Sequence, residues 1–237
     1  AVFKKTADVS NGAMNNYELI GRELGTIQFS TTLYDTALSG VGFDNVDSYD
    51  IDFYDKVFLQ PKLDGVRCIF TKDGAFSRTG KQFKNVAHLE YDLADFFKEH
   101  PFTVLDGELY NHKLKNDFEK IISLVRKTKP TEEDRLDAQH LVQYHVYDTI
   151  AEGPDYDVRY IWLAHNLPIS RSMTLTINNV IRSMAEAKEM HEVYLNEGYE
   201  GSMLRLNKPY EQKRSYNLQK FKDFHDTEAT IIDYVAG

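Results

Sequence analysis

A short stretch of charged residues and one glycine, set between two β-prone segments, constrains the fold more than any other feature of the sequence. The stretch is Lys62-Leu63-Asp64-Gly65-Val66-Arg67. Residues 57–60 and 66–71, on either side, carry β-branched and aromatic residues that favour strands. Glycine permits a tight turn, so a lysine, an aspartate and an arginine are expected to converge at strand ends. Such a turn suits a phosphate group, although a hairpin turn with solvated charges fits the stretch equally well.

The rest of the chain alternates strand and helix patterns. Residues 88–99 have apolar residues at helical spacing, and Pro101 follows as a stop. Further helices are predicted at 117–126, after Thr131 as N-cap, from Asp155 or Asp157 to about His165, and at 184–196 between Ser183 and Gly198 as caps. Further strands are predicted at 102–110, 141–147, 201–206, 218–224 and 228–235. This alternation predicts an α+β domain with antiparallel sheets flanked by helices.

The charge balance excludes one class of nucleic-acid binder. The chain of 237 residues has a net charge of −9, so it does not coat nucleic acid through an overall positive potential. Any nucleic-acid site must be local, and a basic cluster does occur at residues 208–222. No apolar run reaches the roughly 20 residues that cross a bilayer, and the single Cys68 cannot form an internal disulfide. These features predict a soluble, cytoplasmic protein.

Two further motifs place an arginine and a carboxylate near strand ends. In Ser77-Arg78-Thr79-Gly80 the guanidinium group could bind phosphate oxygens bidentately. In Leu105-Asp106-Gly107-Glu108-Leu109 a carboxylate could accept hydrogen bonds from hydroxyl groups. The alternatives are a surface arginine in a turn and a β-turn with exposed acids. Glu108 is the stronger candidate than Asp106, because apolar strand residues flank it.

Three later motifs supply an aromatic ring, a carboxylate and two lysines. They are Tyr144-His145-Val146-Tyr147-Asp148, Tyr199-Glu200-Gly201-Ser202-Met203-Leu204-Arg205 and Leu218-Gln219-Lys220-Phe221-Lys222. The ring of Tyr147 could stack on a base, although a tyrosine in a strand is usually part of the core. Glu200 suits Mg²⁺, which needs one or two carboxylates beside waters and phosphate oxygens. Lys220 and Lys222 share one strand face, where they could neutralise a phosphate or simply be solvated.

In this order, the six motifs resemble those of the covalent nucleotidyltransferases, which comprise ATP-dependent DNA ligases, some RNA ligases and mRNA capping enzymes. Residues 62–67 match the KxDGxR motif of that superfamily at every diagnostic position. Glu-Gly at 200–201 is typical of ligases, whereas capping enzymes usually carry Asp-Gly. The resemblance implies an ATP-grasp-like adenylation domain of a DNA ligase of phage, viral or bacterial type. An RNA ligase stays open as an alternative, a capping guanylyltransferase is less favoured, and a non-enzymatic nucleic-acid-binding module is least favoured.

The resemblance also implies a role for each residue. Lys62 would be the nucleophile that carries AMP, and Lys220, Lys222 and Arg67 would assist, the two lysines by helping Lys62 to lose its proton. The nucleotide site would comprise Gln60, Lys62, Asp64, Arg67, Arg78, Glu108, Tyr147, Glu200, Lys220 and Lys222. Glu200 would hold the metal, with Glu108 as a second candidate. Nucleic acid would contact Arg67 and Arg78, with Lys213 and Arg214 as further candidates.

The implied cofactors are ATP and Mg²⁺ or Mn²⁺, and the implied partner is nicked double-stranded DNA, sealed in repair or replication by a monomer that binds no membrane. Three regions are expected along the chain. Residues 1–50 form an N-terminal segment without an assigned role, and residues 51–225 form the nucleotidyltransferase domain. Residues 226–237 would begin a C-terminal oligonucleotide-binding (OB) fold that the sequence does not otherwise contain.

Overall fold

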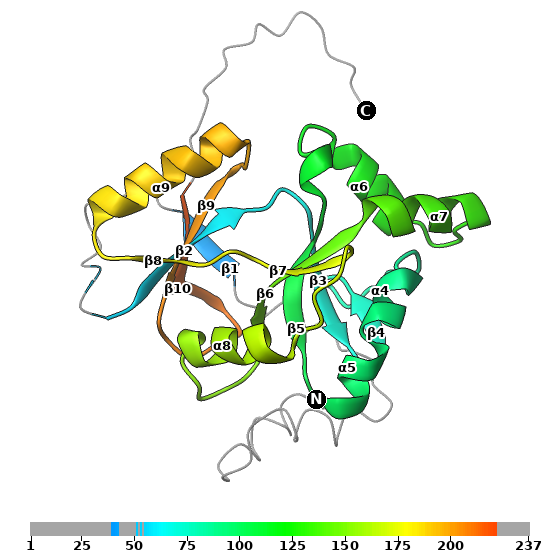
Figure 1. Cartoon of the computed structure of the whole chain (residues 1–237), viewed down its shortest axis with the longest axis horizontal. Helices are drawn as coiled ribbons and strands as arrows, with labels where there is room; N and C mark the ends of the chain where they lie inside the picture. Colours follow the sequence, from blue (N-terminus) through cyan, green and yellow to red (C-terminus); the bar gives the residue numbers. More distant parts are fainter. Residues whose placement is uncertain (1–38, 43–50, 52, 54, 222–237) are drawn as a thin grey trace, which may run out of the picture.

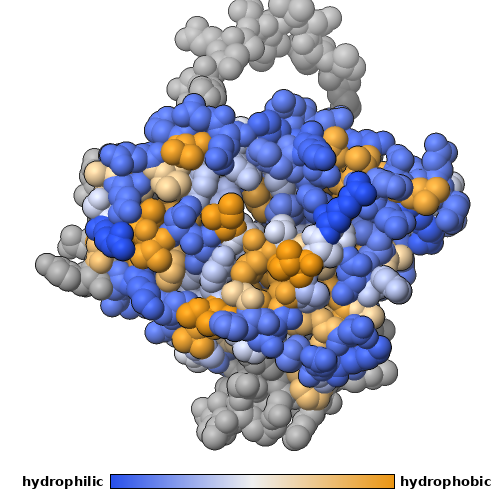
Figure 2. All heavy atoms as spheres, in the orientation of Figure 1, coloured by the Kyte–Doolittle hydropathy of each residue, from blue (hydrophilic) through white to orange (hydrophobic). Residues whose placement is uncertain are grey.

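Two five-stranded sheets make up the fold, one covered on one face by a single helix and the other by several helices (Figure 1). The computed structural model describes residues 39–42, 51, 53 and 55–221. Within these residues no helix is both long and apolar enough to span a membrane. The view in Figure 2 shows a mostly hydrophilic surface, with apolar side chains in small groups, the largest of them near the middle of this face. The predicted α+β class is confirmed.

The first sheet has the strand order β1-β10-β9-β2-β8. Its strands are β1 (Ser39–Gly42), β10 (Arg214–Phe221), β9 (Gly201–Leu206), β2 (Val57–Lys62) and β8 (Asn179–Ile181). Helix α9 (Met184–Glu197) packs on one face, where Val57, Leu59 and Leu204 meet Tyr194 in a small apolar core. Because side chains alternate along a strand, the opposite face of β2, β9 and β10 is left to line a site.

The second sheet has the order β4-β3-β5-β6-β7. Its strands are β4 (Gly74–Phe76), β3 (Val66–Thr71), β5 (Leu105–Tyr110), β6 (Gln143–Thr149) and β7 (Met173–Leu175). Four helices cover one face and enclose the main core: α4 (Ala87–Asp92), α5 (Ala94–Glu99), α6 (Phe118–Val125) and α7 (Glu132–Leu141). Helix α8 (Tyr156–Asn166) contacts β6. Two pairings, β1 with β10 and β6 with β7, are parallel, and the others are antiparallel as predicted.

The stretch at residues 62–67 does not form a hairpin, because β2 and β3 belong to different sheets. Residues 63–65 cross from one sheet to the other, Lys62 is the last residue of β2, and Arg67 lies within β3. Gly65 is required for close packing and not for a left-handed turn. A Cβ atom at Gly65 would lie 2.5 Å from the Leu109 carbonyl oxygen and 2.7 Å from Glu108 Cγ.

Most helix ends lie where capping residues predict them. Thr131 and Asp134 form a reciprocal capping box, Ser183 caps α9, and Gly198 ends α9 in the left-handed region at φ 88°. Asp155 precedes α8 without a side-chain cap bond. The prediction of one continuous helix at residues 88–99 is wrong, because the structure has two short helices there. Leu93, with φ −93° and ψ 0°, ends α4 and precedes α5.

Several strand limits differ from the prediction. Strand β5 begins at Leu105, three residues late, and β6 begins at Gln143 because α7 continues to Leu141. Strand β10 begins at Arg214, four residues early. Strands β1, β7 and β8 are short and were not predicted. The end of the predicted strand at 218–224, the strand at 228–235 and the expected start of an OB fold lie outside the described residues, as does most of the N-terminal segment.

Candidate active site

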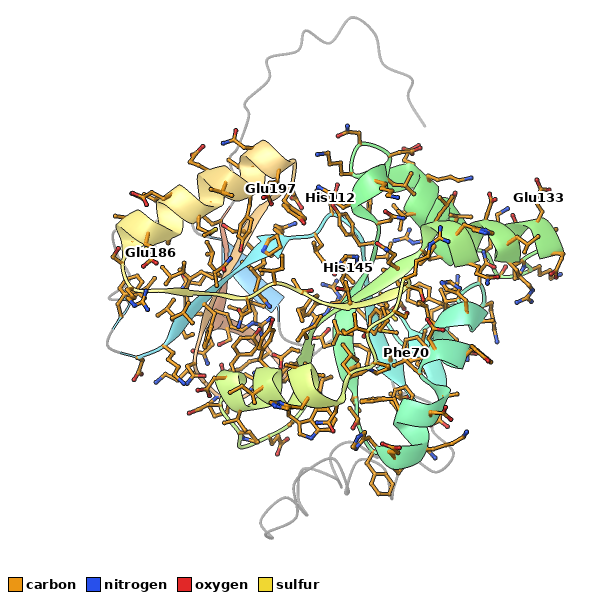
Figure 3. The ribbon with its side chains drawn as sticks, viewed as in Figure 1. Phe70, His112, Glu133, His145, Glu186 and Glu197 are labelled. Carbon is orange, nitrogen blue, oxygen red and sulfur yellow. The ribbon has the colours of Figure 1, made fainter. Side chains whose placement is uncertain are left out.

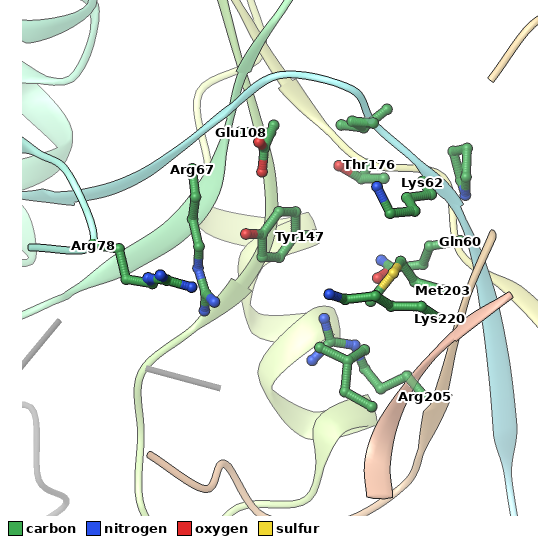
Figure 4. A pocket seen from close by; sticks show the side chains of 13 residues that line it. Gln60, Lys62, Arg67, Arg78, Glu108, Tyr147, Thr176, Met203, Arg205 and Lys220 are labelled. Carbon is green, nitrogen blue, oxygen red and sulfur yellow. The ribbon is translucent and has the colours of Figure 1, made fainter. Parts of the chain in front are cut away.

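A pocket lies between the two sheets and is lined by residues from both (Figure 4). This intersheet pocket encloses about 210 Å³, whereas a single water molecule needs only ~10–15 Å³. It is lined by Gln60, Pro61, Lys62, Leu63, Arg67, Arg78, Glu108, Tyr147, Thr176, Met203, Arg205, Leu218 and Lys220. The lining therefore includes seven residues of the nucleotide site predicted from the sequence.

The first sheet supplies one wall through its strand register. Met203 on β9 is paired with Gln60 on β2 and with Lys220 on β10, so these three side chains form a row across the sheet. Arg205 and Leu218 form the next row. Because side chains alternate, Met203 and Arg205 of β9 face the pocket together, as do Leu218 and Lys220 of β10. Strand geometry alone thus brings residues from distant parts of the sequence to one surface.

The second sheet supplies the opposite wall. Arg67 on β3 is paired with Glu108 on β5. Between β5 and β6 the register shifts, so that Asp106 is paired with Asp148 while Gly107 is paired with Val146. Tyr147 is the extra residue of this bulge, and a bulge redirects a side chain. In Figure 4, Tyr147 stands in the middle of the pocket, with Arg67 and Arg78 on one side and the two lysines on the other.

Lys62 lies at the end of β2, where its side-chain nitrogen donates to the carboxylate of Glu200. Glu200 directly precedes β9, and the pairing of Lys62 with Gly201 accounts for the contact. Both side chains are partly exposed, at 19% and 29%. The amine of Lys62 is therefore held by the carboxylate of Glu200.

Arg67 is held by Asp106, the residue that the sequence suggested less strongly than Glu108. Its Nε and Nη2 atoms donate to the two carboxylate oxygens at 2.9 and 2.6 Å. The hydroxyl of Tyr210 donates to the same carboxylate at 2.9 Å. Asp106 is almost fully buried, with 2% of its side chain exposed. This bidentate arrangement fixes the guanidinium at the wall of the pocket.

Glu108 faces the pocket without a positive partner as close as the one Asp106 has. Burial raises the pKa of its carboxyl to about 8; the charge of Asp106 adds to the rise, and the charge of Arg67 opposes it. Glu108 is therefore mostly protonated at neutral pH in the absence of a ligand. A protonated carboxyl can donate one hydrogen bond and accept another.

A buried charged network that the sequence analysis missed lies beneath Tyr147. Asp148 is fully buried and accepts from Arg159 Nε at 2.8 Å, from Arg159 Nη2 at 3.0 Å and from Arg205 Nη1 at 2.8 Å. The Arg205 guanidinium lies 4.5 Å from the ring centroid of Tyr156 and 5.9 Å from that of Tyr147. Alternation along β9 from Met203 could have indicated that Arg205 faces the pocket. Nothing in the sequence indicated its partner.

The remaining predicted residues lie in several places. Arg78 is exposed and lines the pocket, whereas Asp64 is exposed and does not. In the predicted basic cluster, Lys213 pairs with Glu211 at 2.9 Å, and Arg214 is an exposed residue at the start of β10. Neither residue lines the intersheet pocket. Lys222 lies outside the described residues.

Comparison with known proteins agrees with this geometry. Residues 48–222 match the model of a family described as the ATP dependent DNA ligase domain. The DNA ligase of Enterobacteria phage T6 is 26% identical over 223 residues, covering 74% of this chain and 46% of that ligase. The DNA ligase of Haemophilus influenzae is 27% identical over 182 residues, covering 76% of this chain and 62% of that ligase. The chain spans about half the length of the phage and viral relatives it matches.

Solved structures share the fold. A Lig E DNA ligase superposes with a TM-score of 0.69 at 23% identity, covering 85% of this chain and 73% of that one. Chlorella virus DNA ligase-adenylate superposes with a TM-score of 0.62 at 21% identity, covering 78% of this chain and 66% of that one. These likenesses establish the nucleotidyltransferase fold. Since the family model covers most of the chain, the protein belongs to the family of ATP-dependent DNA ligase domains.

Proposed function

We propose that this chain is a ligase adenylation domain in which Lys62 takes AMP from ATP and passes it to the 5′-phosphate at a DNA nick. The observation that carries the proposal is the convergence of Lys62, Arg67, Glu108, Tyr147 and Lys220 on one pocket between two sheets. A nucleophilic amine, cationic groups for phosphates and an aromatic face for a base are the groups that this chemistry needs. Membership of an ATP-dependent family supports the same conclusion.

In the first step, the Lys62 amine loses a proton and leaves its contact with Glu200. The neutral nitrogen then attacks the α-phosphorus of ATP, forming a P–N bond while the P–O bond to pyrophosphate breaks. Lys220, two strands away on the same wall, would offset negative charge on the phosphates. We expect Lys222 to act beside it, because it would share the face of the strand.

The base and the sugar are proposed to be held by the second sheet. Tyr147 presents its ring in the middle of the pocket, opposite Met203 from the first sheet, and a purine between them would bury its apolar faces. Glu108, protonated near neutral pH, can both donate to and accept from a ribose hydroxyl. Gln60 lies in the same row as Met203, with its amide nitrogen bound to the Tyr156 hydroxyl at 2.9 Å.

The residues present fit a metal ion that ATP helps to hold. Glu200 offers a partly exposed carboxylate, and Mg²⁺ commonly takes one or two carboxylates beside waters and phosphate oxygens. Among the described residues, no three metal-ligating side chains are grouped, so these residues alone do not build a cage. When bound, Mg²⁺ or Mn²⁺ would offset phosphate charge. Glu108 is the second candidate ligand, because its carboxyl group also lines the pocket.

The later steps are proposed to use the arginines. An oxygen of the 5′-phosphate attacks the lysyl-AMP phosphorus and breaks the P–N bond. The adjoining 3′-hydroxyl then attacks the activated 5′-phosphorus, forms the new phosphodiester bond and releases AMP. Arg78, which is exposed at the pocket, would receive the 5′-phosphate, and Arg67, which lies at the wall nearby, would assist. We expect a monomer to act on nicked double-stranded DNA, with Lys213 and Arg214 as candidate backbone contacts.

The test is covalent labelling with α-labelled ATP or GTP, for the parent chain, Lys62→Ala and Lys56→Ala. Lys56 is a matched control, because it does not line the pocket. Its side-chain nitrogen pairs with the carboxylate of Asp157 at 2.5 Å. We expect an ATP-specific adduct on the parent and on Lys56→Ala, and none on Lys62→Ala. A GTP-only adduct, or equal labelling of Lys62→Ala, would overturn the proposal. A comparison of sealing at nicks with DNA ends and at nicks with RNA ends then shows whether the substrate strand is DNA or RNA.

A further inference from the structure

The carboxyl end of α9, which leads into Glu200, is held by two side chains from the segment that follows strand β5 of the second sheet. Nε2 of His112 lies 3.1 Å from the Glu197 carbonyl oxygen, and Nζ of Lys115 donates to the same oxygen at 2.6 Å. His112 and Lys115 follow β5, in and directly after a 3₁₀ helix, η2 (His112–Leu114). In Figure 3, His112 and Glu197 are neighbours at the end of α9. These two donors satisfy a carbonyl at the negative end of a helix.

The orientation of the His112 ring follows from its partners. A carbonyl oxygen can only accept, so in the neutral ring Nε2 carries the proton and Nδ1 accepts from the Tyr110 hydroxyl at 2.7 Å. Burial raises the pKa of Tyr110, which keeps that hydroxyl protonated. The imidazole also lies against the ring of Tyr199, with 4.3 Å between the centroids and 33° between the ring planes. Tyr199 is the residue next to Glu200.

Strand β5 and the segment after it also lie close to the chain near Lys62 and near Glu200. Gly198 packs so closely on Lys115 that a Cβ atom there would lie 2.3 Å from Nζ. On the other side, a Cβ atom at Gly65, in the segment after Lys62, would lie 3.2 Å from Tyr110 Cβ. The end of β5 and the residues after it therefore contact the chain on both sides of the ion pair.

We propose that His112 and Lys115 are positioning residues that hold Glu200 against Lys62, so that the second sheet sets the geometry of the nucleophile on the first. The expected effect on the rate of lysyl-AMP formation rests on the proposed function. The position of Glu200 against Lys62 does not. If these residues only cap α9, their loss would lower stability and leave the Lys62 and Glu200 contact unchanged.

The test uses a double-mutant cycle on the full chain. His112→Phe keeps an aromatic ring on Tyr199 and removes the donor, His112→Gln restores a donor, and Lys115→Met removes the ammonium. Lys113→Met is the matched control, because Lys113 is an exposed neighbour on the same 3₁₀ helix. Each change is made with Glu200 intact and with Glu200→Gln. If His112→Phe does not fold, Lys115→Met carries the test at the same carbonyl oxygen.

Two readouts are compared at matched temperature below each melting midpoint. Single-turnover formation of lysyl-AMP is expected to slow ~10-fold in His112→Phe and Lys115→Met, because misplacement of a reacting group is costly. ATP affinity should change less than about twofold, and His112→Gln should recover most of the rate. In the Glu200→Gln background, the same substitutions should change the rate less than about twofold, because a contact already lost cannot be lost again.

The second readout needs no ATP. Acetylation of Lys62 by an acylating ester, followed by mass spectrometry, is expected to become faster in both variants and to match Glu200→Gln, since a released amine is more available. Additive rate effects together with unchanged acetylation would overturn the inference and leave helix capping as the role of His112 and Lys115. Absence of lysyl-AMP on the parent chain would instead overturn the proposed function, and acetylation would still decide the positioning role.

Discussion

The side-chain nitrogen of Lys62 contacts the carboxylate of Glu200 where β2 ends and β9 is about to begin. The pairing of Lys62 with Gly201 brings the two residues together, so backbone register contributes to the placement of the proposed nucleophile. Two partly exposed side chains of opposite charge would contribute little to stability. In the proposed reaction their juxtaposition matters, because the amine would have to be released from the carboxylate before it attacks.

Substitution of Glu200 by glutamine is expected to keep the fold and to slow adenylation. The amide has the size of the carboxylate but no charge, so it cannot offset a cation. We expect lysyl-AMP formation to slow by about 100-fold, as is typical when one electrostatic contact in an active site is lost. A higher Mg²⁺ concentration should be needed for half of the maximal rate. Glu192→Gln, on the exposed side of α9, should retain the parent rate, and equal rates for both variants would rule out the role of Glu200.

The free energy of unfolding should decrease as pH rises, because of Glu108. Its carboxyl has an ordinary pKa near 4.5 in the unfolded chain and about 8 in the fold. The folded state therefore binds more protons between these values, and the stabilisation present below pH ~4.5 is lost as pH rises through ~8. In Glu108→Gln this contribution is absent, so its melting temperature should fall less between pH 5.5 and pH 9. If the melting temperatures of the two proteins changed equally with pH, the raised pKa of Glu108 would be contradicted.

Local features of the fold could be predicted from the sequence, because the determining residues are close in the chain. The caps at Thr131 and Ser183 and the left-handed Gly198 each depend on neighbours within a few positions. Alternation of Lys220 with its neighbours placed it on one face of β10. The same reasoning could not tell that residues 88–99 divide at Leu93, because the apolar spacing continues across that point.

Pairing across the fold could not be predicted in the same way. Arg67 and Asp106 are 39 positions apart, and Asp148 and Arg205 are 57 apart. Which partners meet depends on strand order and on the bulge at Tyr147. The sequence therefore indicated most residues of the intersheet pocket but not the buried groups that support them. It also suggested a turn at Gly65, where the structure requires a close approach between segments.

Loss of Arg67 should destabilise the fold more than loss of Arg78, although both arginines line the pocket. Arg67→Met leaves the buried carboxylate of Asp106 with the Tyr210 hydroxyl as its remaining side-chain donor among the described residues. Removing one partner of a buried pair typically costs about 3–5 kcal/mol, and the 18% exposure of Arg67 favours the lower end. Arg78→Met, at an exposed position, should change the free energy of unfolding by less than ~0.5 kcal/mol.

Urea denaturation of the two methionine variants at neutral pH makes the comparison. The midpoint for Arg67→Met should fall well below that of the parent, with a similar slope. Equal midpoints for the two variants would show that the contact with Asp106 contributes nothing to folding. Asp106→Asn combined with Arg67→Met should be less than additive, because the two residues share one interaction.

Gly65→Ala tests whether close packing holds the crossing segment that follows Lys62. The new Cβ atom would lie 2.5 Å from the Leu109 carbonyl oxygen and 2.7 Å from Glu108 Cγ, so the backbone must move. Such overpacking typically costs about 1–3 kcal/mol, and the displaced segment should also slow lysyl-AMP formation. Gly153→Ala is the control, because Gly153 has φ +98° with open space around it. That change should cost only the ~1–2 kcal/mol of a left-handed alanine and leave the rate unchanged; an unchanged rate in Gly65→Ala would show that the crossing does not position Lys62.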